Sequence, residues 1–329
     1  MPYSNFITAK FAKLNGLRRD ANWHLRTNRS WIKHANGGRI LAYHGICLTN
    51  PFRFNTLFVR LKTFEEQLKL YKKYFSIVSL DDFYNRRFTD EKFTICLTFD
   101  DGFANNYIHV LPLLEKYQVP ATFFVTGIRD AGYDILWNDV LAIAGKYGPS
   151  KLVFKKETLI KNRNGKYISP DGRHLNDLLR AEDFENKAEI VKLLGLYKSK
   201  ANNDYWLQMT EKEIEILSKS KWTTIGSHGY YHNDFAKISA ASAKEELTRS
   251  KNFLEKIIGK EVKALAFPYG SYSKEAVNQA KIAGFTQLLA TEFIFSEDRN
   301  DAMFRERLTI NPFISNINQL HANINGNYR

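Results

Sequence analysis

From about residue 39 to the C-terminus, short apolar runs alternate with longer amphipathic stretches. The short runs are rich in β-branched and aromatic residues, which is typical of buried strands. They cover residues 39–46, 76–80, 93–99, 121–125, 223–226, 264–267, 287–290 and 307–310. Strands that alternate with helices indicate a parallel sheet, and about eight such units favour a closed barrel over an open sheet. The pattern therefore predicts an α/β fold, a (β/α) barrel of about seven or eight strands.

Helix boundaries are marked at several points between these runs. Thr63 with Glu66 and Thr210 with Glu213 match the capping box, in which a threonine side chain and a glutamate side chain satisfy the first free N–H groups of a helix. We therefore expect a helix to open after each threonine. Pro112 is expected to kink or interrupt the helix that follows residue 104, because proline lacks an N–H group.

The spacing of the strands divides the chain into unequal parts. Residues 1–38 form a basic N-terminal arm, expected to be an amphipathic helix or partly ordered. Residues 39–329 are expected to form the barrel, with a long insertion at about 128–221 where strand signals fail. Within the insertion, which is predicted to be mostly helical, one hairpin is expected near residues 151–154.

Composition and charge narrow the set of partners. The chain has 44% hydrophobic residues and a formal net charge of +13, so it is a globular chain with an electropositive surface. We find no nucleic-acid-binding motif, and an acidic or lipid-linked saccharide fits the charge as well as a simple solubilising surface does. Cys47 and Cys96 lie in apolar segments and are expected to be buried thiols rather than a disulfide or metal ligands.

No continuous apolar run in the sequence is long enough for a signal peptide or a transmembrane helix. This favours a cytoplasmic location, although a chain from which a signal had been removed would look the same. The oligomeric state is not indicated by the sequence.

Two adjacent acids, Asp100 and Asp101, follow a predicted buried strand and precede Gly102. Catalytic groups of β/α barrels lie at the carboxyl ends of strands. Consecutive strand residues point in opposite directions, but a turn at Gly102 can bring both carboxylates to one cleft, where one binds a metal and the other takes a proton. The alternative is an acidic cap at the start of the next helix.

Two histidines, His228 and His232, follow another short apolar strand. Residues four apart lie on one face of a helical turn, so both imidazoles can bind one metal; a chance pairing is the alternative. Together with Asp101 they form a set of one carboxylate and two imidazoles. Such a set leaves positions open for water and substrate, as in hydrolytic metal sites.

A third motif surrounds Tyr269, which lies between Pro268 and Gly270 after a predicted strand. Proline and glycine would hold the backbone so that the Tyr269 amide can point at a developing oxyanion. An ordinary turn explains this motif equally well when it is taken alone.

The three motifs, in this order and context, resemble those of the polysaccharide deacetylases of the NodB homology type. This is a metal-dependent carbohydrate esterase family with a distorted (β/α) barrel. The resemblance covers roughly residues 39–127 and 222–310, and its most specific element is the run Thr-Phe-Asp-Asp-Gly at 98–102.

The resemblance implies a role for each singled-out residue. Asp100 would be the general base, and Tyr269 would supply the backbone donor to the oxyanion. The implied metal ligands are Asp101, His228 and His232, and the implied metal is usually zinc. The implied activity is removal of N-acetyl groups from an amino-sugar glycan or glycan precursor.

The sequence departs from the family pattern at two points. Ala266 stands where the family usually has an arginine that orients the base, and Arg305 or Arg307 is a candidate to replace it. The family's Leu-x-x-His near the C-terminus is also missing, but the first strand ends in Leu41-Ala42-Tyr43-His44. A barrel closes on itself, so this end can reach the same site. The order is similar to that of the permuted poly-N-acetylglucosamine deacetylases, and His44 becomes the candidate general acid, with a buried core histidine as the alternative.

Two other functions remain open at this point: hydrolysis of a related non-sugar amide or imide, and glycan binding by a catalytically impaired homologue. The insertion is expected to shape the substrate groove. Its residues Trp137, Asn138, Asp139, Tyr205 and Trp206 offer stacking faces and polar contacts, although the aromatic ones fit a packed core as well.

Overall fold

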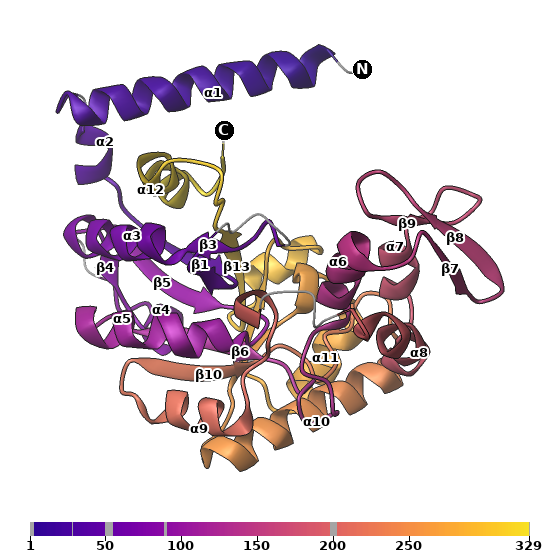
Figure 1. Cartoon of the computed structure of the whole chain (residues 1–329). Coiled ribbons are helices and arrows are strands. Elements are labelled where there is room, and N and C mark those ends of the chain that lie inside the picture. Colours follow the sequence, from indigo (N-terminus) through magenta and orange to yellow (C-terminus); the bar gives the residue numbers. More distant parts are fainter. Residues whose placement is uncertain (1–2, 28, 50–54, 89–90, 198–202, 329) are drawn as a thin grey trace.

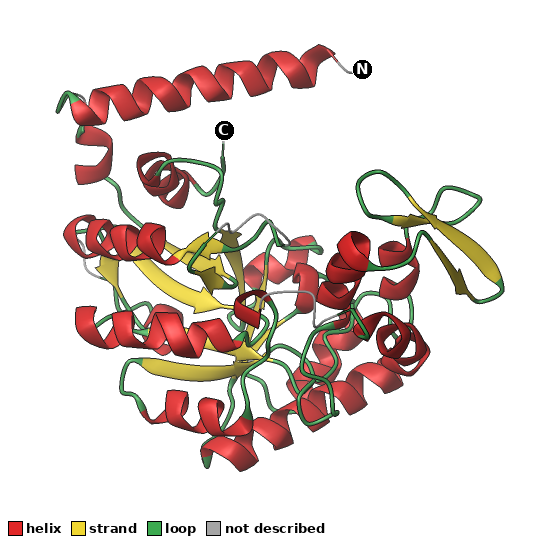
Figure 2. Cartoon of the chain, viewed as in Figure 1, coloured by secondary structure: helices red, strands yellow, loops and turns green. Residues whose placement is uncertain are grey.

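Seven parallel strands close into a barrel in the computed structural model, which describes residues 3–27, 29–49, 55–88, 91–197 and 203–328 (Figures 1 and 2). The strands are β1 (Gly38–Tyr43), β5 (Thr94–Phe99), β6 (Ala121–Val125), β10 (Thr223–Ser227), β11 (Ala264–Ala266), β12 (Gln287–Ala290) and β13 (Phe304–Thr309). Their order around the barrel is β1-β13-β12-β11-β10-β6-β5, and β1 pairs again with β5 to complete the ring. The predicted distorted (β/α) barrel of seven or eight strands is confirmed.

Three short strands lie outside this ring. β4 (Ser76–Ile77) pairs with the start of β5, and β6 pairs with the end of β5 on the same edge. β2 (Ile46–Cys47) and β3 (Val59–Arg60) form a separate parallel pair. The strands predicted at 39–46 and 76–80 are therefore shorter in the structure, and the first is divided between β1 and β2.

Successive residues of the barrel strands belong to two different hydrophobic clusters. Ile40, Cys96 and Phe124 belong to a small cluster of strand residues that packs on α4. Their neighbours along the strands, such as Leu41 and Leu97, belong to the large cluster beneath the helices. This period of two, with both faces apolar, is expected of a parallel sheet covered on both sides. Cys96 is a buried free thiol, as is Cys47, in agreement with the sequence-based prediction.

Helices pack around the barrel. They are α3 (Leu61–Tyr74), α4 (Leu80–Tyr84), α5 (Leu111–Tyr117), α9 (Glu211–Lys219), α10 (Ala240–Ile258), α11 (Lys274–Ile282) and α12 (Asn316–Asn325). The capping box of Thr210 and Glu213 is present at the start of α9. The expected cap at Thr63 is wrong, because α3 already begins at Leu61, directly after β3. A π-helical turn at Asn106–Val110 interrupts the helix before Pro112, as the proline predicts.

The N-terminal residues form α1 (Tyr3–His24) and the short α2 (Ser30–Lys33), and α1 lies across α12 at the top of Figure 1. Arg19 donates to Asn318 at 2.8 Å, and Ser315 donates to Asp20 at 2.6 Å, so the end of α1 is tied to α12. Among the described helices, none is long and apolar enough to cross a membrane.

The part of the chain between β6 and α9 carries its own elements, which are α6 (Trp137–Tyr147), β7 (Lys151–Phe154), β8 (Glu157–Lys161), β9 (Tyr167–Ile168), α7 (Leu175–Arg180), α8 (Phe184–Gly195) and a 3₁₀ turn (Asn203–Tyr205). We call it the β6–β10 segment. β7 forms the expected hairpin with β8, and the small sheet β7–β9 stands out from the barrel in Figure 1. Trp137, Tyr205 and Trp206 are buried in a separate hydrophobic core of this segment, so they pack rather than offer stacking faces.

Candidate active site

A cavity of about 420 Å³ opens at the carboxyl ends of the barrel strands. All residues that the sequence analysis assigned to the site line it, together with an arginine from β13; these are His44, Asp100, Asp101, His228, His232, Tyr269 and Arg307. His44 follows β1, the two aspartates follow β5, the histidine pair follows β10 and Tyr269 follows β11. The closed barrel therefore brings groups that are far apart in sequence to one position, as expected at this end of a β/α barrel.

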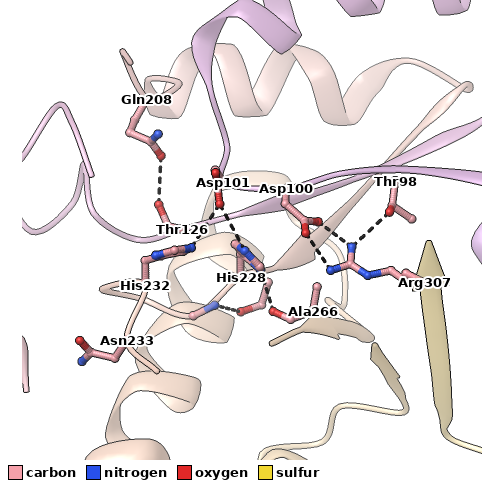
Figure 3. A network of polar contacts seen from close by, with 12 residues as sticks. Thr98, Asp100, Asp101, Thr126, Gln208, His228, His232, Asn233, Ala266 and Arg307 are labelled. Atoms are coloured by element: carbon pink, nitrogen blue, oxygen red, sulfur yellow. Dashed lines mark hydrogen bonds and ion pairs between the residues drawn. The ribbon is translucent and has the colours of Figure 1, made fainter. Parts of the chain in front are cut away.

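Asp101, His228 and His232 form a buried cluster within this cavity (Figure 3). The Asp101 Oδ1 atom lies 3.4 Å from His228 Nε2 and 3.2 Å from His232 Nε2. Zinc ligands at about 2.0–2.2 Å in a tetrahedron are themselves about 3.3 Å apart, so these separations suit a single ion. The donor set, one carboxylate oxygen and two imidazole nitrogens, also fits a divalent metal.

The His228 ring is oriented by a contact behind the cluster. Figure 3 shows its contact with the carbonyl oxygen of Ala266, and the Nδ1 atom lies 2.7 Å from that oxygen. A carbonyl can only accept, so Nδ1 carries the proton. Nε2 then offers a lone pair to a metal when the ring is neutral, and it donates a second proton to Asp101 when the ring is charged. Ala266 thus has a structural part in the site through its backbone, although its side chain lacks the charge of the arginine expected there.

Left-handed backbone conformations occur at several residues that line the cavity. Asp101, His232 and Tyr269 have φ angles of 74°, 57° and 61°. Few residues other than glycine adopt such angles, and they persist where surrounding contacts hold them. At Asp101 this conformation continues into Gly102, with φ 77°, and it turns the chain so that both aspartates line one cavity. The turn expected at Gly102 is therefore present.

Asp100 makes a two-pronged ion pair with Arg307 of β13 (Figure 3). Arg307 Nη1 donates to Oδ1 at 2.6 Å, and Nη2 donates to Oδ2 at 2.7 Å. Nη1 also donates to the Thr98 hydroxyl at 3.1 Å, which in turn donates to the Leu41 carbonyl at 2.9 Å. Of the two arginines proposed to replace the missing one, Arg307 is therefore the partner of Asp100. Arg305 instead contacts backbone carbonyls and the Tyr84 ring.

The carboxyls of Asp100 and Asp101 are held in their ionised form. Burial alone would raise the pKa of Asp100, but the Arg307 charge and hydrogen bonds outweigh it and the pKa lies below its usual value. Burial also acts to raise the pKa of Asp101, and hydrogen bonds from His228 and His232 bring it well below the ordinary value. Both carboxylates can therefore serve as a ligand or a proton acceptor at neutral pH.

The two imidazoles differ in their response to this environment. Burial acts to lower the pKa of His228, but the charges of Asp100 and Asp101 raise it above its usual value. Burial lowers the pKa of His232, and the contact with Asp101 only partly compensates. Binding of a cation would require both rings to be neutral at Nε2, so cation binding competes with protonation of His228.

His44 and Tyr269 line the cavity without a fixed polar partner. The Nδ1 atom of His44 and the hydroxyl of Tyr269 are buried and have no hydrogen-bond partner among the described residues. The Tyr269 ring packs between the His232 ring, 4.8 Å away between centroids, and the Arg180 guanidinium, 4.2 Å from the ring centre. His44 is thus placed at the site rather than in the barrel core.

A polar network from the β6–β10 segment supports the loop after β10 that carries His228 and His232, and the sequence analysis missed this network. Arg180 of α7 donates to Asp234 at 2.6 and 3.0 Å, and Lys187 of α8 donates to Asn233 at 2.6 Å. Asn233 donates to Glu246 of α10 at 2.8 Å. Asn233 and Asp234, directly after His232, were a signal that this loop is anchored. Their partners lie too far away in the sequence to be inferred from it.

The polar residues at the start of α6 take part in the cavity wall. Asn138 and Asp139 both line the cavity, as the sequence analysis expected for polar contacts of the insertion. Asp139 is buried, and its Oδ2 atom has no hydrogen-bond partner in the described part of the chain. Burial, followed by the nearby negative charge of Asp101, raises the pKa of Asp139 well above its usual value.

Comparison with known proteins places this site in a family. A family model described as polysaccharide deacetylase matches residues 88–148 and 184–288, which together make up half of the chain. YxkH of Bacillus subtilis (strain 168), named as a polysaccharide deacetylase, is 33% identical over 109 residues, which are 30% of this chain and 36% of YxkH. The chain thus matches only about a third of the length of this relative.

Solved structures share the fold at low sequence identity. The Streptococcus pyogenes deacetylase PplD, in complex with acetate, has a TM-score of 0.58 and 19% identity, and the similarity covers 87% of this chain and 97% of PplD. IcaB from Ammonifex degensii has a TM-score of 0.55 and 17% identity, over 88% of this chain and 98% of IcaB. At these identities the likeness supports the distorted barrel alone.

The matched segments contain the acidic pair, the histidine pair and Tyr269, whereas His44 and Arg307 lie outside them on β1 and β13. The resemblance inferred from the motifs and the family match therefore agree. This chain belongs to the polysaccharide deacetylase family.

Proposed function

We propose that this chain is a metal-dependent hydrolase that removes N-acetyl groups from an amino-sugar glycan or glycan precursor. One observation carries the proposal: the Arg307–Asp100 pair lies in the same cavity as the cluster of Asp101, His228 and His232. A proton acceptor and a set of metal ligands in one cavity are the parts that hydrolysis of an amide requires. Family membership supports the same reaction class.

The ion would be held by Asp101, His228 and His232, and zinc is the best match to this donor set. A divalent ion supplies Lewis acidity, which polarises an acyl carbonyl and makes water more acidic. The polypeptide supplies the proton transfers and the positioning.

Asp100 is the proposed general base. In the reaction, water attacks the acyl carbon, Asp100 accepts a proton from that water, and the C–N bond then breaks to give acetate and a free amine. Arg307 is a positioning residue, since its two donors engage both Asp100 oxygens and leave each with a lone pair for the water. We infer that this pair takes the place of the arginine that the family usually carries where Ala266 stands, which counters the weak argument for an impaired site that the missing arginine gave.

His44 is the proposed general acid, which protonates the departing amine. Its position at the end of β1, in the wall of the same cavity as Asp100, supports this role. The Tyr269 backbone N–H is the proposed donor to the oxyanion that forms when water attacks, and its left-handed backbone beside Pro268 fits a fixed turn. The substrate would be an N-acetylated saccharide, acidic or lipid-linked in keeping with the net charge of +13.

The proposal is tested by release of acetate from N-acetylglucosamine oligomers. The zinc-loaded protein is expected to release acetate, and the same protein treated with a chelator is expected to release none until zinc is restored. The variant D301N serves as a control, because Asp301 pairs with Lys281 away from the cavity. It is expected to release acetate as the unmodified protein does. A fully metallated protein without activity on any acylated amino sugar would contradict the proposal.

A further inference from the structure

A second and larger cavity, of about 900 Å³, adjoins the catalytic one. The two share lining residues Thr56, Asn138, Ala142 and Asn176. The remaining wall comes from the end of α6, the start of α7 and the turn at 162–166. Most of this wall lies between the two segments that the family model matches, so family membership does not explain it.

Backbone contacts hold the wall in place. Gly145 of α6 and Gly165 of the turn approach so closely that a Cβ at Gly145 would overlap with the Gly165 carbonyl oxygen. The turn itself is closed by a hydrogen bond from Asn162 N to Lys166 O at 2.8 Å, and Asn162 Oδ1 accepts from the N–H of Asn164 and that of Lys166. The turn and the helix are therefore fixed against each other, and so is the cavity that they enclose.

The lining of this cavity is cationic. Lys146, Arg163 and Lys166 line it, and Asp177 is the carboxylate among the described lining residues. In the described part of the chain, no carboxylate lies within ion-pair distance of Arg163 or Lys166, whereas Arg173 nearby pairs with two acids. Arg163 and Lys166 therefore leave positive charge at this cavity without a carboxylate partner in the described part of the chain, and such charge attracts anions.

The cavity also contains polar atoms that need a partner. The Oδ1 atom of Asn138, where the two cavities meet, and the Nδ1 atom of His174 are buried and have no hydrogen-bond partner among the described residues. An unsatisfied buried polar atom is costly, and ligands commonly satisfy such atoms at binding sites. Sugar hydroxyls both donate and accept, so they suit an amide oxygen and an imidazole nitrogen alike.

We propose that the second cavity binds the part of the substrate next to the reacting sugar, and that this part is an anionic saccharide group bearing a carboxylate or a phosphate. The inference rests on the proposed function, because it treats the cavity as an extension of the same substrate site. It narrows the substrate from an acidic or lipid-linked N-acetylated saccharide to one with a negative charge directly beside the acetylated sugar.

Binding by the chelator-treated protein tests this inference without turnover. The probes are N-acetylchitotetraose, which is neutral, a hyaluronan tetrasaccharide, which carries carboxylates, and UDP-N-acetylglucosamine, which carries a diphosphate. Calorimetry is expected to show at least one anionic probe binding about tenfold more tightly than the neutral one, since three charge contacts give about that difference. The probe that binds more tightly identifies the anionic group.

The charge variant K146Q/R163Q/K166Q is expected to lose this preference. The control K151Q/K156Q/K260Q removes the same net charge from exposed positions outside the cavity and is expected to keep it. Circular dichroism checks that both variants fold. Equal binding of neutral and anionic probes by the unmodified protein, or an unchanged preference in the charge variant, would overturn the inference. Because binding is measured without metal, a failure to release acetate would leave this result standing and would count against the proposed function alone.

Discussion

The two sides of the candidate active-site cavity differ in the hydrogen bonds of their acidic and amide groups. On the barrel side, Asp100 and Asp101 are hydrogen-bonded to charged or imidazole partners from other strand ends. On the side of the β6–β10 segment, Asp139 Oδ2 and Asn138 Oδ1 are buried and have no hydrogen-bond partner among the described residues. The carboxyls of the barrel side thus already have partners, whereas these two oxygens of the β6–β10 segment have none among the described residues.

The carboxyl pKa values show the same difference. Despite burial, those of Asp100 and Asp101 lie below the ordinary value because cationic or hydrogen-bonding partners stabilise the ionised form. That of Asp139 lies above it, chiefly because of burial and then because of the Asp101 charge. The two carboxyls on the barrel side are thus held in their ionised form, whereas the Asp139 carboxyl is held in its neutral form.

The largest effect is expected from D101N. Asparagine offers a weaker neutral ligand in place of the carboxylate, so zinc affinity falls and acetate release drops by about 10³-fold or more, since the ion contributes several kcal/mol. Metal content after dialysis and acetate release at fixed zinc measure the two effects. A D101N protein with full zinc content and full activity would remove Asp101 from the site.

D100N is expected to retain zinc but to lose about 10²–10³-fold in kcat, because the proton acceptor is gone and the ligands remain. Metal analysis and kcat from the same preparation separate this variant from D101N. If D100N lost zinc instead, Asp100 would be a ligand, and the division of roles between the two aspartates would be wrong.

R307M is expected to lower kcat by about 10–100-fold with zinc still bound, since removal of an orienting partner has effects of that size. It is also expected to destabilise the fold by about 3–5 kcal/mol, because Asp100 stays buried without its partner. R305M is the matched control, because Arg305 lies two residues away on the same strand and contacts Tyr84 instead. Equal loss in both variants would contradict a specific role of Arg307.

The acid limb of the pH profile of kcat/KM is expected to shift in R307M. Asp100 has a lowered pKa, so its ionised form persists down to pH values below about 3.9, the ordinary value for aspartate, and is lost only as the pH falls further. Without Arg307, burial prevails and the pKa of Asp100 rises, so the acid limb of R307M should lie at higher pH than that of the unmodified protein. Profiles at saturating zinc measure this shift, and identical acid limbs would contradict the assigned partnership.

Sequence alone predicted the groups whose position depends on local structure. Asp100, Asp101, His228 and His232 directly follow strands, and the strand ends of a barrel meet. The choice between Arg305 and Arg307 needed the register, because residues two apart on a strand face the same way. In the structure Arg307 pairs with Ile40 of β1, whereas Arg305 pairs with Leu289 of β12.

Contacts with the β6–β10 segment could not be predicted, because its fold has no repeating pattern. Asp234 pairs with Arg180, which is 54 residues earlier in the chain. The cap expected at Thr63 failed for a local reason, since the chain leaves β3 at Arg60 and enters α3 at once. A capping pair therefore indicates a nearby helix start but does not place it when a strand end competes.

The smallest effect is expected from D139N, on stability. A carboxyl with a raised pKa is protonated in the folded protein and ionised in the unfolded chain, so its presence lowers stability as the pH rises above the unfolded value. Asparagine does not ionise, so D139N should be more stable by about 1 kcal/mol at pH 8 and little changed at pH 4. Urea unfolding of the chelator-treated proteins at both pH values measures this, and a loss of stability at pH 8 would show that Asp139 is ionised and paired.

A zinc titration with simultaneous measurement of acetate tests the central claim most directly. Chelator-treated protein is mixed with an N-acetylglucosamine oligomer, and zinc is added in steps. Acetate release is expected to rise in proportion to zinc, to level off at about one equivalent, and to stay absent in H228A/H232A, because three protein ligands define one site. Full acetate release before zinc is added, or the same titration curve in the double variant, would contradict the account.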